Sequence, residues 1–221
     1  MILRSPLPRS LSLLFCLAVS ACSPAKHPIM LGADDATYPF TLTSPGELSS
    51  DFMVRQAISV SIVAGGEKRE GKLDAVLQKH GDSLLIVGLG PMNTRAFVIE
   101  YRDGHVRYEH TNKSMPALPI APRALVVDVE RVYLAHLPIP AETFSGRLEG
   151  TINGERVTED WALGTLRRRS FAREGRFEKP IVIEFGAGYT TKNPDPHRIV
   201  LDNPWLGYKV TIVSEGAEPL D

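Results

Sequence analysis

Residue types that could carry out catalysis are present in this sequence, but their spacing keeps them apart. His105 and His110 are an odd number of positions apart on one expected strand, so their side chains project from opposite faces. Glu159 and Asp160 are adjacent, and we expect both at the surface of a strand. The sequence contains neither a serine flanked by glycines in a nucleophile elbow nor a paired-histidine zinc helix. We therefore predict no catalytic residue, no metal site, no cofactor and no enzymatic activity.

One cysteine lies in a context that predicts covalent modification. Arg4 and Arg9 precede a short apolar stretch, Leu11 to Val19, which leads into Ser20-Ala21-Cys22. A positive segment, an apolar segment and small residues before a cysteine are typical of a lipoprotein signal peptide. We predict that residues 1–21 are removed and that Cys22 is acylated, which anchors the chain to a membrane. An ordinary secretory signal in which Cys22 is incidental is the alternative.

The residue after Cys22 bears on the choice of membrane. In lipoproteins of Gram-negative bacteria an aspartate there usually causes retention at the inner membrane, whereas this chain has Ser23. We therefore expect a lipid-anchored protein of the outer membrane that faces the periplasm. Removal of residues 1–21 takes away two arginines and no acidic residue, so the formal net charge changes from −1 to −3. This balance suggests no nucleic-acid partner.

The densest cluster of positive charge is Arg167, Arg168 and Arg169. It predicts a contact with anionic lipid headgroups or with an acidic envelope protein. A solvated hairpin, partly neutralised by Glu174 and Glu178, is the alternative interpretation, because charge runs usually mark exposed faces.

Alternating apolar and polar residues predict many strands. Residues 72–110 indicate four short strands that fold back on one another. Three of them have one mostly apolar face, whereas Leu84 to Leu89 is apolar on both faces, which predicts a central strand covered on both sides. Before them, Asp51 to Ala64 is an expected strand, followed by a polar loop at residues 65–71 that closes a hairpin. After them, Asn153-Gly154 is a strong hairpin signal, and Trp161 to Ser170 is expected to be a further strand.

One segment has the periodicity of a helix. Between Arg123 and His136, apolar residues recur at spacings of three and four, with Pro122 at the expected first turn and Pro138 beyond the end. Its many β-branched residues leave a strand at Leu125–Val129 as the alternative. With about ten strands and one main helix, the predicted fold class is mainly β or α+β. We expect a tether at residues 22–50 and a single domain at 51–221.

Three stretches support a resemblance to a known family. They are Leu85 to Tyr101 with the following Asp103-Gly104, Pro122 to Leu137, and Leu201 to Tyr208. Together with the lipoprotein signal, their order is similar to that of the outer-membrane lipoprotein localisation proteins, the LolA carrier and the LolB receptor. More closely, it resembles a family of bacterial lipoproteins often encoded among aryl-polyene pigment synthesis genes. The resemblance implies a curved, half-open antiparallel sheet with the helix on its concave face, and a hydrophobic concavity for acyl chains. This chain has fewer clear helices than the localisation proteins.

The apolar sheet face and the helix supply the candidate lining of such a concavity. The candidate ligand-binding residues are Phe97, Ile99, Tyr101, Val106, Tyr108, Val129 and Tyr133. For each of them, a place in a packed core is the alternative. The leading functional hypothesis is a receptor or carrier for a lipid, a lipoprotein or a lipidic pigment. The competing hypotheses are a structural or assembly lipoprotein that docks another envelope protein, and an enzyme acting on lipid-linked substrates.

Overall fold

The structure, a computed structural model, describes residues 42–47, 51–64, 66–112, 120–138, 140–175, 177–186 and 197–220. The signal peptide, Cys22 and most of the tether predicted from the sequence lie outside these residues.

Within the described residues, eleven strands form one sheet that is open at both edges. Their spatial order is β5-β4-β3-β2-β1-β11-β10-β9-β8-β7-β6, and every neighbouring pair is antiparallel. The strands are β1 (Phe52–Ala64), β2 (Glu67–His80), β3 (Ser83–Leu89), β4 (Arg95–Arg102), β5 (His105–His110), β6 (Gly146–Ile152), β7 (Glu155–Ala162), β8 (Thr165–Ala172), β9 (Ile181–Phe185), β10 (Arg198–Asn203) and β11 (Tyr208–Pro219).

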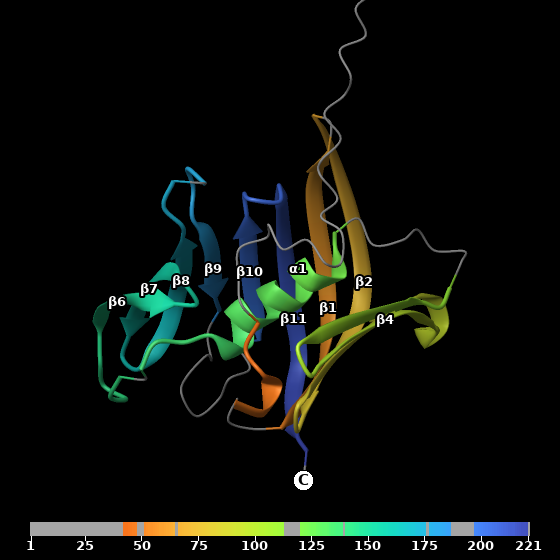
Figure 1. The fold of residues 1–221 in the computed structure, drawn as a ribbon, viewed down its shortest axis with the longest axis horizontal. Helices are drawn as coiled ribbons and strands as arrows, with labels where there is room; N and C mark the ends of the chain where they lie inside the picture. Colours follow the sequence, from red (N-terminus) through yellow and green to blue (C-terminus); the bar gives the residue numbers. More distant parts are fainter. Residues whose placement is uncertain are drawn as a thin grey trace, which may run out of the picture.

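The helical part of the chain crosses one face of this sheet (Figure 1). The chain runs outward from β1 to the edge at β5, then crosses through α1 (Pro122–Val129) and η3 (Glu130–Leu134) to the opposite edge at β6. It returns strand by strand to β11, which pairs with β1 and joins the two halves. Two short 3-10 turns, η1 (Pro45–Glu47) and η2 (Pro91–Asn93), complete the description. The predicted plan of a half-open antiparallel sheet with one helix on it is confirmed.

The helix is buried on two sides, which explains why a valine-rich segment is helical. Val126, Val132 and Tyr133 belong to the main core beneath it. Val127, together with the small residue Ala124, forms a second cluster with Leu42 of the segment that precedes η1. Pro122 suits the first turn because its fixed φ is already helical. Burial on both sides outweighs the modest cost of β-branched residues in a helix.

Several boundaries differ from those predicted. Residues 67–71 of the expected loop belong to β2, which begins at Glu67 and pairs with β1 from Glu67 to Lys79. The expected strand at 161–170 is the end of β7 and the start of β8, joined by a turn at Leu163-Gly164. The helix ends at Leu134 rather than His136, and its last turn, η3, is a wider π-helix.

Candidate ligand-binding cavity

Two buried arginines fix the helix to the sheet. Arg131, on η3, has no exposed surface and donates two hydrogen bonds to the carboxylate of Glu155 on β7, at 2.7 and 3.1 Å, and one to Asp128 at 2.8 Å. Burial raises the pKa of Glu155, and the nearby charge of Arg131 opposes that rise. Because the charges of Arg131 and Glu155 are both buried, removing one partner would leave the other charge without compensation in the protein interior. The ion pair is therefore required for stability.

The second arginine holds the end of the π-helix. Arg169 on β8 is fully buried and donates to Glu159 on β7 at 2.7 Å. Its guanidinium also donates to the backbone carbonyls of Arg131 and Val132, at 2.8 and 3.3 Å. These carbonyls belong to the last turn of the helix, where no intrahelical partner is available. Arg169 therefore acts as a side-chain cap supplied by the sheet.

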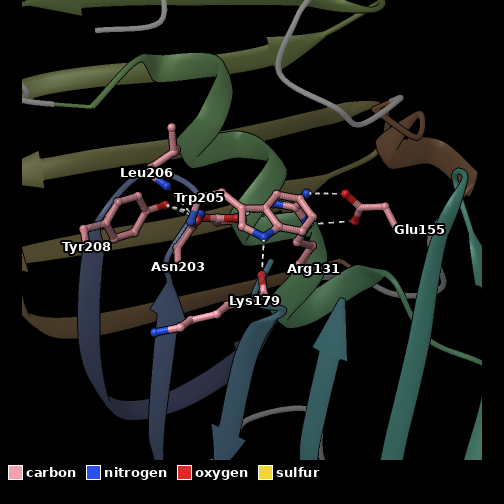
Figure 2. Close-up of polar contacts among 8 residues, drawn as sticks. Arg131, Glu155, Lys179, Asn203, Trp205, Leu206 and Tyr208 are labelled. Atoms are coloured by element: carbon pink, nitrogen blue, oxygen red, sulfur yellow. Dashed lines mark hydrogen bonds and ion pairs between the residues drawn. The ribbon is translucent and has the colours of Figure 1, made fainter. Parts of the chain in front are cut away.

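Asp128 links the helix to the turn between β10 and β11, where Figure 2 shows Asn203, Trp205 and Tyr208. Its carboxylate accepts hydrogen bonds from Asn203 at 2.9 Å and from the hydroxyl of Tyr208. The Asn203 side chain also accepts from the backbone N–H groups of Trp205 and Leu206, at 3.1 and 3.2 Å, which sets the turn. In Figure 2 the Trp205 ring lies beside Arg131, whose guanidinium carbon is 5.1 Å from the ring centroid.

Glu130 has a different environment from the other buried acids. It is 1% exposed, and one carboxyl oxygen, Oε2, accepts a hydrogen bond from the backbone N–H of Thr43 at 3.2 Å. Its other oxygen has no hydrogen-bond partner among the described residues. Burial raises the pKa of Glu130 from 4.5 to about 8, only partly opposed by the Thr43 hydrogen bond and by the charges of Arg123 and Arg131. Glu130 is therefore largely protonated at neutral pH.

An apolar cavity of about 140 Å³ lies between the helix and the central strands. Most of its walls are aliphatic, and the polar side chains among its described lining residues are Gln56, Asp128, Tyr133 and Tyr208. The full lining is Gln56, Ile58, Val60, Leu73, Ala75, Leu77, Ile86, Phe97, Ile120, Leu125, Asp128, Val129, Val132, Tyr133, Leu201, Tyr208, Val210 and Ile212. A cavity of this volume is large enough for a benzene-sized molecule.

The structure brings together three of the seven candidate ligand-binding residues. Phe97, Val129 and Tyr133 line the cavity. Ile99 and Tyr101 are buried in the core but do not line it, and Val106 and Tyr108 lie on the edge strand β5. Tyr108 is 36% exposed, and its ring centroid lies 6.4 Å from those of both His110 and Phe97. These four residues are therefore placed outside the cavity.

Residues from three other strands form much of the cavity wall and were missed in the sequence. β1 contributes Gln56, Ile58 and Val60, and β2 and β11 lie beside it in the sheet. The pairing of β1 with β11 is invisible in a single sequence, because the two strands come from opposite ends of the domain. Gln56 was the sequence signal that could have indicated this wall of the cavity, because it is a polar residue on an otherwise apolar face of β1.

The arginine cluster divides between the surface and the interior. Arg167 and Arg168 are exposed on β8, whereas Arg169 is fully buried against Glu159. A headgroup or partner could not reach Arg169 in this structure, so we remove it from the proposed contact surface. Glu159 is buried as well, which corrects the expectation that both members of the Glu159-Asp160 pair lie at the surface.

The part of the chain that the structure describes was also compared with the requirements of a metal site and of a membrane-spanning helix. No set of three His, Cys, Asp or Glu side chains there could hold a metal ion. No helix in the described ranges is long and apolar enough to cross a membrane.

The fold and its cavity thus define an open, helix-covered β-sheet protein with an apolar site under the helix. The chain belongs to the DUF3261 family, described as a protein of unknown function, whose family model matches residues 53–216. No curated protein matches this chain.

Several solved structures show a weak likeness. A LolA superfamily protein from Nitrosomonas europaea is 12% identical with a TM-score of 0.42, over 78% of this chain and 87% of that one. A DUF1329 family protein from Desulfovibrio piger is 12% identical with a TM-score of 0.42, over 77% and 86%. A Vibrio parahaemolyticus domain, provisionally assigned to outer membrane lipoprotein sorting, is 12% identical with a TM-score of 0.35, over 77% and 85%. These values are too low to transfer a ligand or an activity.

Proposed function

We propose that this chain is a lipid-binding lipoprotein of the bacterial outer membrane. Acylated Cys22 anchors it on the periplasmic side, and the cavity beneath α1 and η3 accepts the apolar chain of a lipid, a lipoprotein or a lipidic pigment such as an aryl polyene. The observation that carries the proposal is the apolar cavity itself, which lies between a helix and an open sheet. Binding is driven by removal of hydrocarbon from water, at about 0.8 kcal/mol for each buried methylene.

The volume of the cavity limits what enters it without rearrangement. At about 140 Å³ it is smaller than the roughly 300 Å³ at which ordinary ligand pockets begin. A full acyl chain therefore requires the helix to move away from the sheet. Asp128, Arg131, Val132 and Tyr133 each take part in an ion pair or a side-chain hydrogen bond with the sheet, and these contacts hold the helix over the cavity.

Capture of a labelled phospholipid from vesicles tests the proposal, using the chain from Ser23 onward. Ala75 is 1% exposed and lines the cavity, so Ala75→Leu fills part of the space. Ala57→Leu is the matched control, because Ala57 is exposed on the opposite face of neighbouring β1. We expect the wild type and Ala57→Leu to capture lipid and Ala75→Leu to lose capture while remaining folded. Equal capture by all three folded proteins would place the lipid site elsewhere.

A second function, docking of another envelope protein, has support from a different surface. Arg167 and Arg168 are exposed on β8, and the edge strands β5 and β6 each have one side without a strand neighbour among the described residues. An acidic partner held by this surface would be released by salt and by the double change Arg167→Ala and Arg168→Ala. Cavity filling by Ala75→Leu would leave such docking unchanged.

A further inference from the structure

The cavity wall contains two pairs of polar side chains, and one pair is already bonded within the protein. The Asp128 carboxylate accepts a hydrogen bond at each oxygen, from Arg131 at Oδ1 (2.8 Å) and from Asn203 at Oδ2 (2.9 Å). The hydroxyl of Tyr208, the other lining residue of this pair, donates to the same carboxylate. These two lining residues therefore direct their polar groups to the protein rather than to a ligand.

The second pair, Gln56 and Tyr133, leaves one polar atom without a bond. On the helix-facing side of β1, Val54, Gln56, Ile58 and Val60 follow one another, so Gln56 interrupts an otherwise apolar row. Its side-chain amide nitrogen donates a hydrogen bond to the Tyr133 hydroxyl. Its carbonyl oxygen, Oε1, has no hydrogen-bond partner among the described residues. The Gln56 amide is thus held at one end and unbonded at the other.

The unbonded oxygen of Gln56 lies where a ligand can reach it. Gln56 is 5% exposed, and its side chain lines the cavity. Some unpartnered polar atoms of the described residues are completely enclosed, such as Glu130 Oε1, but Gln56 Oε1 is not one of them. It therefore borders open space, and the cavity is the open space that this side chain lines. Because a carbonyl oxygen only accepts hydrogen bonds, a ligand must supply the donor.

Charge in the cavity wall restricts the kind of donor. Among the described lining residues none is Lys, Arg or His, and the acidic one, Asp128, is already paired with Arg131 at 2.8 Å. A ligand carboxylate or ammonium would thus be buried without a counter-charge of its own, which is strongly unfavourable. A hydroxyl or an amide N–H donates to Gln56 without this cost.

We infer that the cavity selects uncharged amphiphiles that carry a hydroxyl or an amide N–H over hydrocarbons, ethers and esters that lack a donor. The ligand donates a hydrogen bond to Gln56 Oε1, and its hydrocarbon lies along Ile58 and Val60. This inference rests on the proposed function and specifies the ligand class of the same site.

Two isomeric probes, 1-pentanol and butyl methyl ether, test this selectivity because they have the same atoms and differ in the donor. A third probe, pentylammonium at pH 7.5, combines a donor with a charge. Each is titrated into the isotope-labelled chain from Ser23 onward and followed by NMR. For the wild type we expect pentanol to bind about five to ten times more tightly than the ether, the ratio that one net hydrogen bond supplies. Pentylammonium should bind at least about 100 times more weakly than pentanol.

Gln56→Leu removes the amide and keeps a side chain of similar size. This variant should bind the ether at least as tightly as pentanol, because no acceptor remains for the hydroxyl proton. Gln78→Leu is the matched control and should keep the preference for pentanol. Gln78 follows Leu77, a cavity-lining residue of β2, so it lies on the opposite face of the sheet.

Tyr133→Phe tests the same amide by a different route and serves if Gln56→Leu does not fold. Loss of the Tyr133 hydroxyl removes the partner of the Gln56 amide nitrogen, so this nitrogen can donate to an ether oxygen. We expect the ether to gain affinity and the preference for pentanol to narrow.

The outcomes distinguish this inference from the function on which it rests. Equal binding of the two isomers by the wild type, or tighter binding of the ether, would overturn the donor requirement and leave an apolar-chain site intact. Tightest binding of pentylammonium would overturn the choice of an uncharged ligand. An unchanged preference for pentanol in Gln56→Leu, or in Tyr133→Phe, would remove the Gln56 amide from the site. If none of the probes binds, the inference fails, and capture of labelled phospholipid decides separately whether the proposed function stands.

Discussion

Replacement of Glu130 should change how the stability of this protein depends on pH. The folded pKa of Glu130 is about 8, against 4.5 for an ordinary glutamate. The folded state therefore holds the Glu130 proton more tightly than the unfolded state does. Binding of this proton contributes fully to the free energy of unfolding below pH 4.5. This contribution declines as the pH rises and is lost once the pH passes about 8.

The size of the effect follows from the two pKa values. Each unit of difference corresponds to about 1.4 kcal/mol, which gives a loss of roughly 4 kcal/mol in the free energy of unfolding between pH 5 and pH 9. Glu130→Gln removes the titrating group but keeps an oxygen that can accept the Thr43 N–H hydrogen bond. We expect the wild type to lose this amount relative to Glu130→Gln across the range.

Urea denaturation at several pH values, followed by tryptophan fluorescence, measures this difference. Trp161 is 6% exposed in the folded protein, so its emission reports unfolding. Glu149→Gln provides the control, because Glu149 is exposed on β6 and its replacement should leave the pH dependence unchanged. If the wild type and Glu130→Gln lose stability in parallel from pH 5 to pH 9, the assignment of a buried, protonated Glu130 is refuted.

Two further substitutions test the packing and the ion pairs that shape the cavity. A Cβ atom on Gly88 would lie 2.2 Å from the Phe97 ring, so Gly88→Ala should displace the ring and lower stability by about 1–3 kcal/mol in thermal unfolding. Gly71→Ala, whose new Cβ meets no atom closer than 3.9 Å, should have a much smaller effect, and equal losses would contradict the packing described. Arg131→Met leaves buried carboxylates unpaired and should cost about 3–5 kcal/mol in urea unfolding. The exposed ion pair between Arg147 and Asp160 should contribute less than about 1 kcal/mol to the free energy of unfolding. If Arg147→Met and Arg131→Met lower that free energy by similar amounts, burial does not determine the strength of these ion pairs.

The sequence was sufficient to predict the secondary structure where local patterns are strong. One-sided alternation identified β2, β4 and β5, a continuous apolar run identified β3, and Asn153-Gly154 identified the turn between β6 and β7. The spacing of apolar residues after Pro122 identified the helix. Each of these features depends on residues only a few positions apart, which is why it can be recognised in one sequence.

The buried ion pairs could not be predicted, because they depend on a turn that the sequence conceals. Glu159 and Arg169 are cross-strand partners only if the chain reverses at Leu163-Gly164. Leu163 has a φ of 50°, a conformation in which leucine is uncommon, so the residues around it resemble a continuous strand. Without that turn, the pattern groups Arg169 with its exposed neighbours Arg167 and Arg168.

The cavity could be predicted only in part, since its walls combine local and distant contacts. Phe97, Val129 and Tyr133 were found because each lies on the apolar face of a recognisable element. The pairing of Val60 with Val210, which line the cavity together, depends on contact between the first and last strands. No local pattern specifies that pairing or its register.

Mass spectrometry of the molecules that co-purify with the chain from Ser23 onward, exported to the periplasm and isolated without detergent, tests the central proposal most directly. We expect a lipid, an acylated peptide or a lipidic pigment bound in a one-to-one ratio, and its loss from the Ala75→Leu variant. A folded wild-type protein that carries no such molecule and takes up none when lipid is added would contradict ligand binding in the cavity.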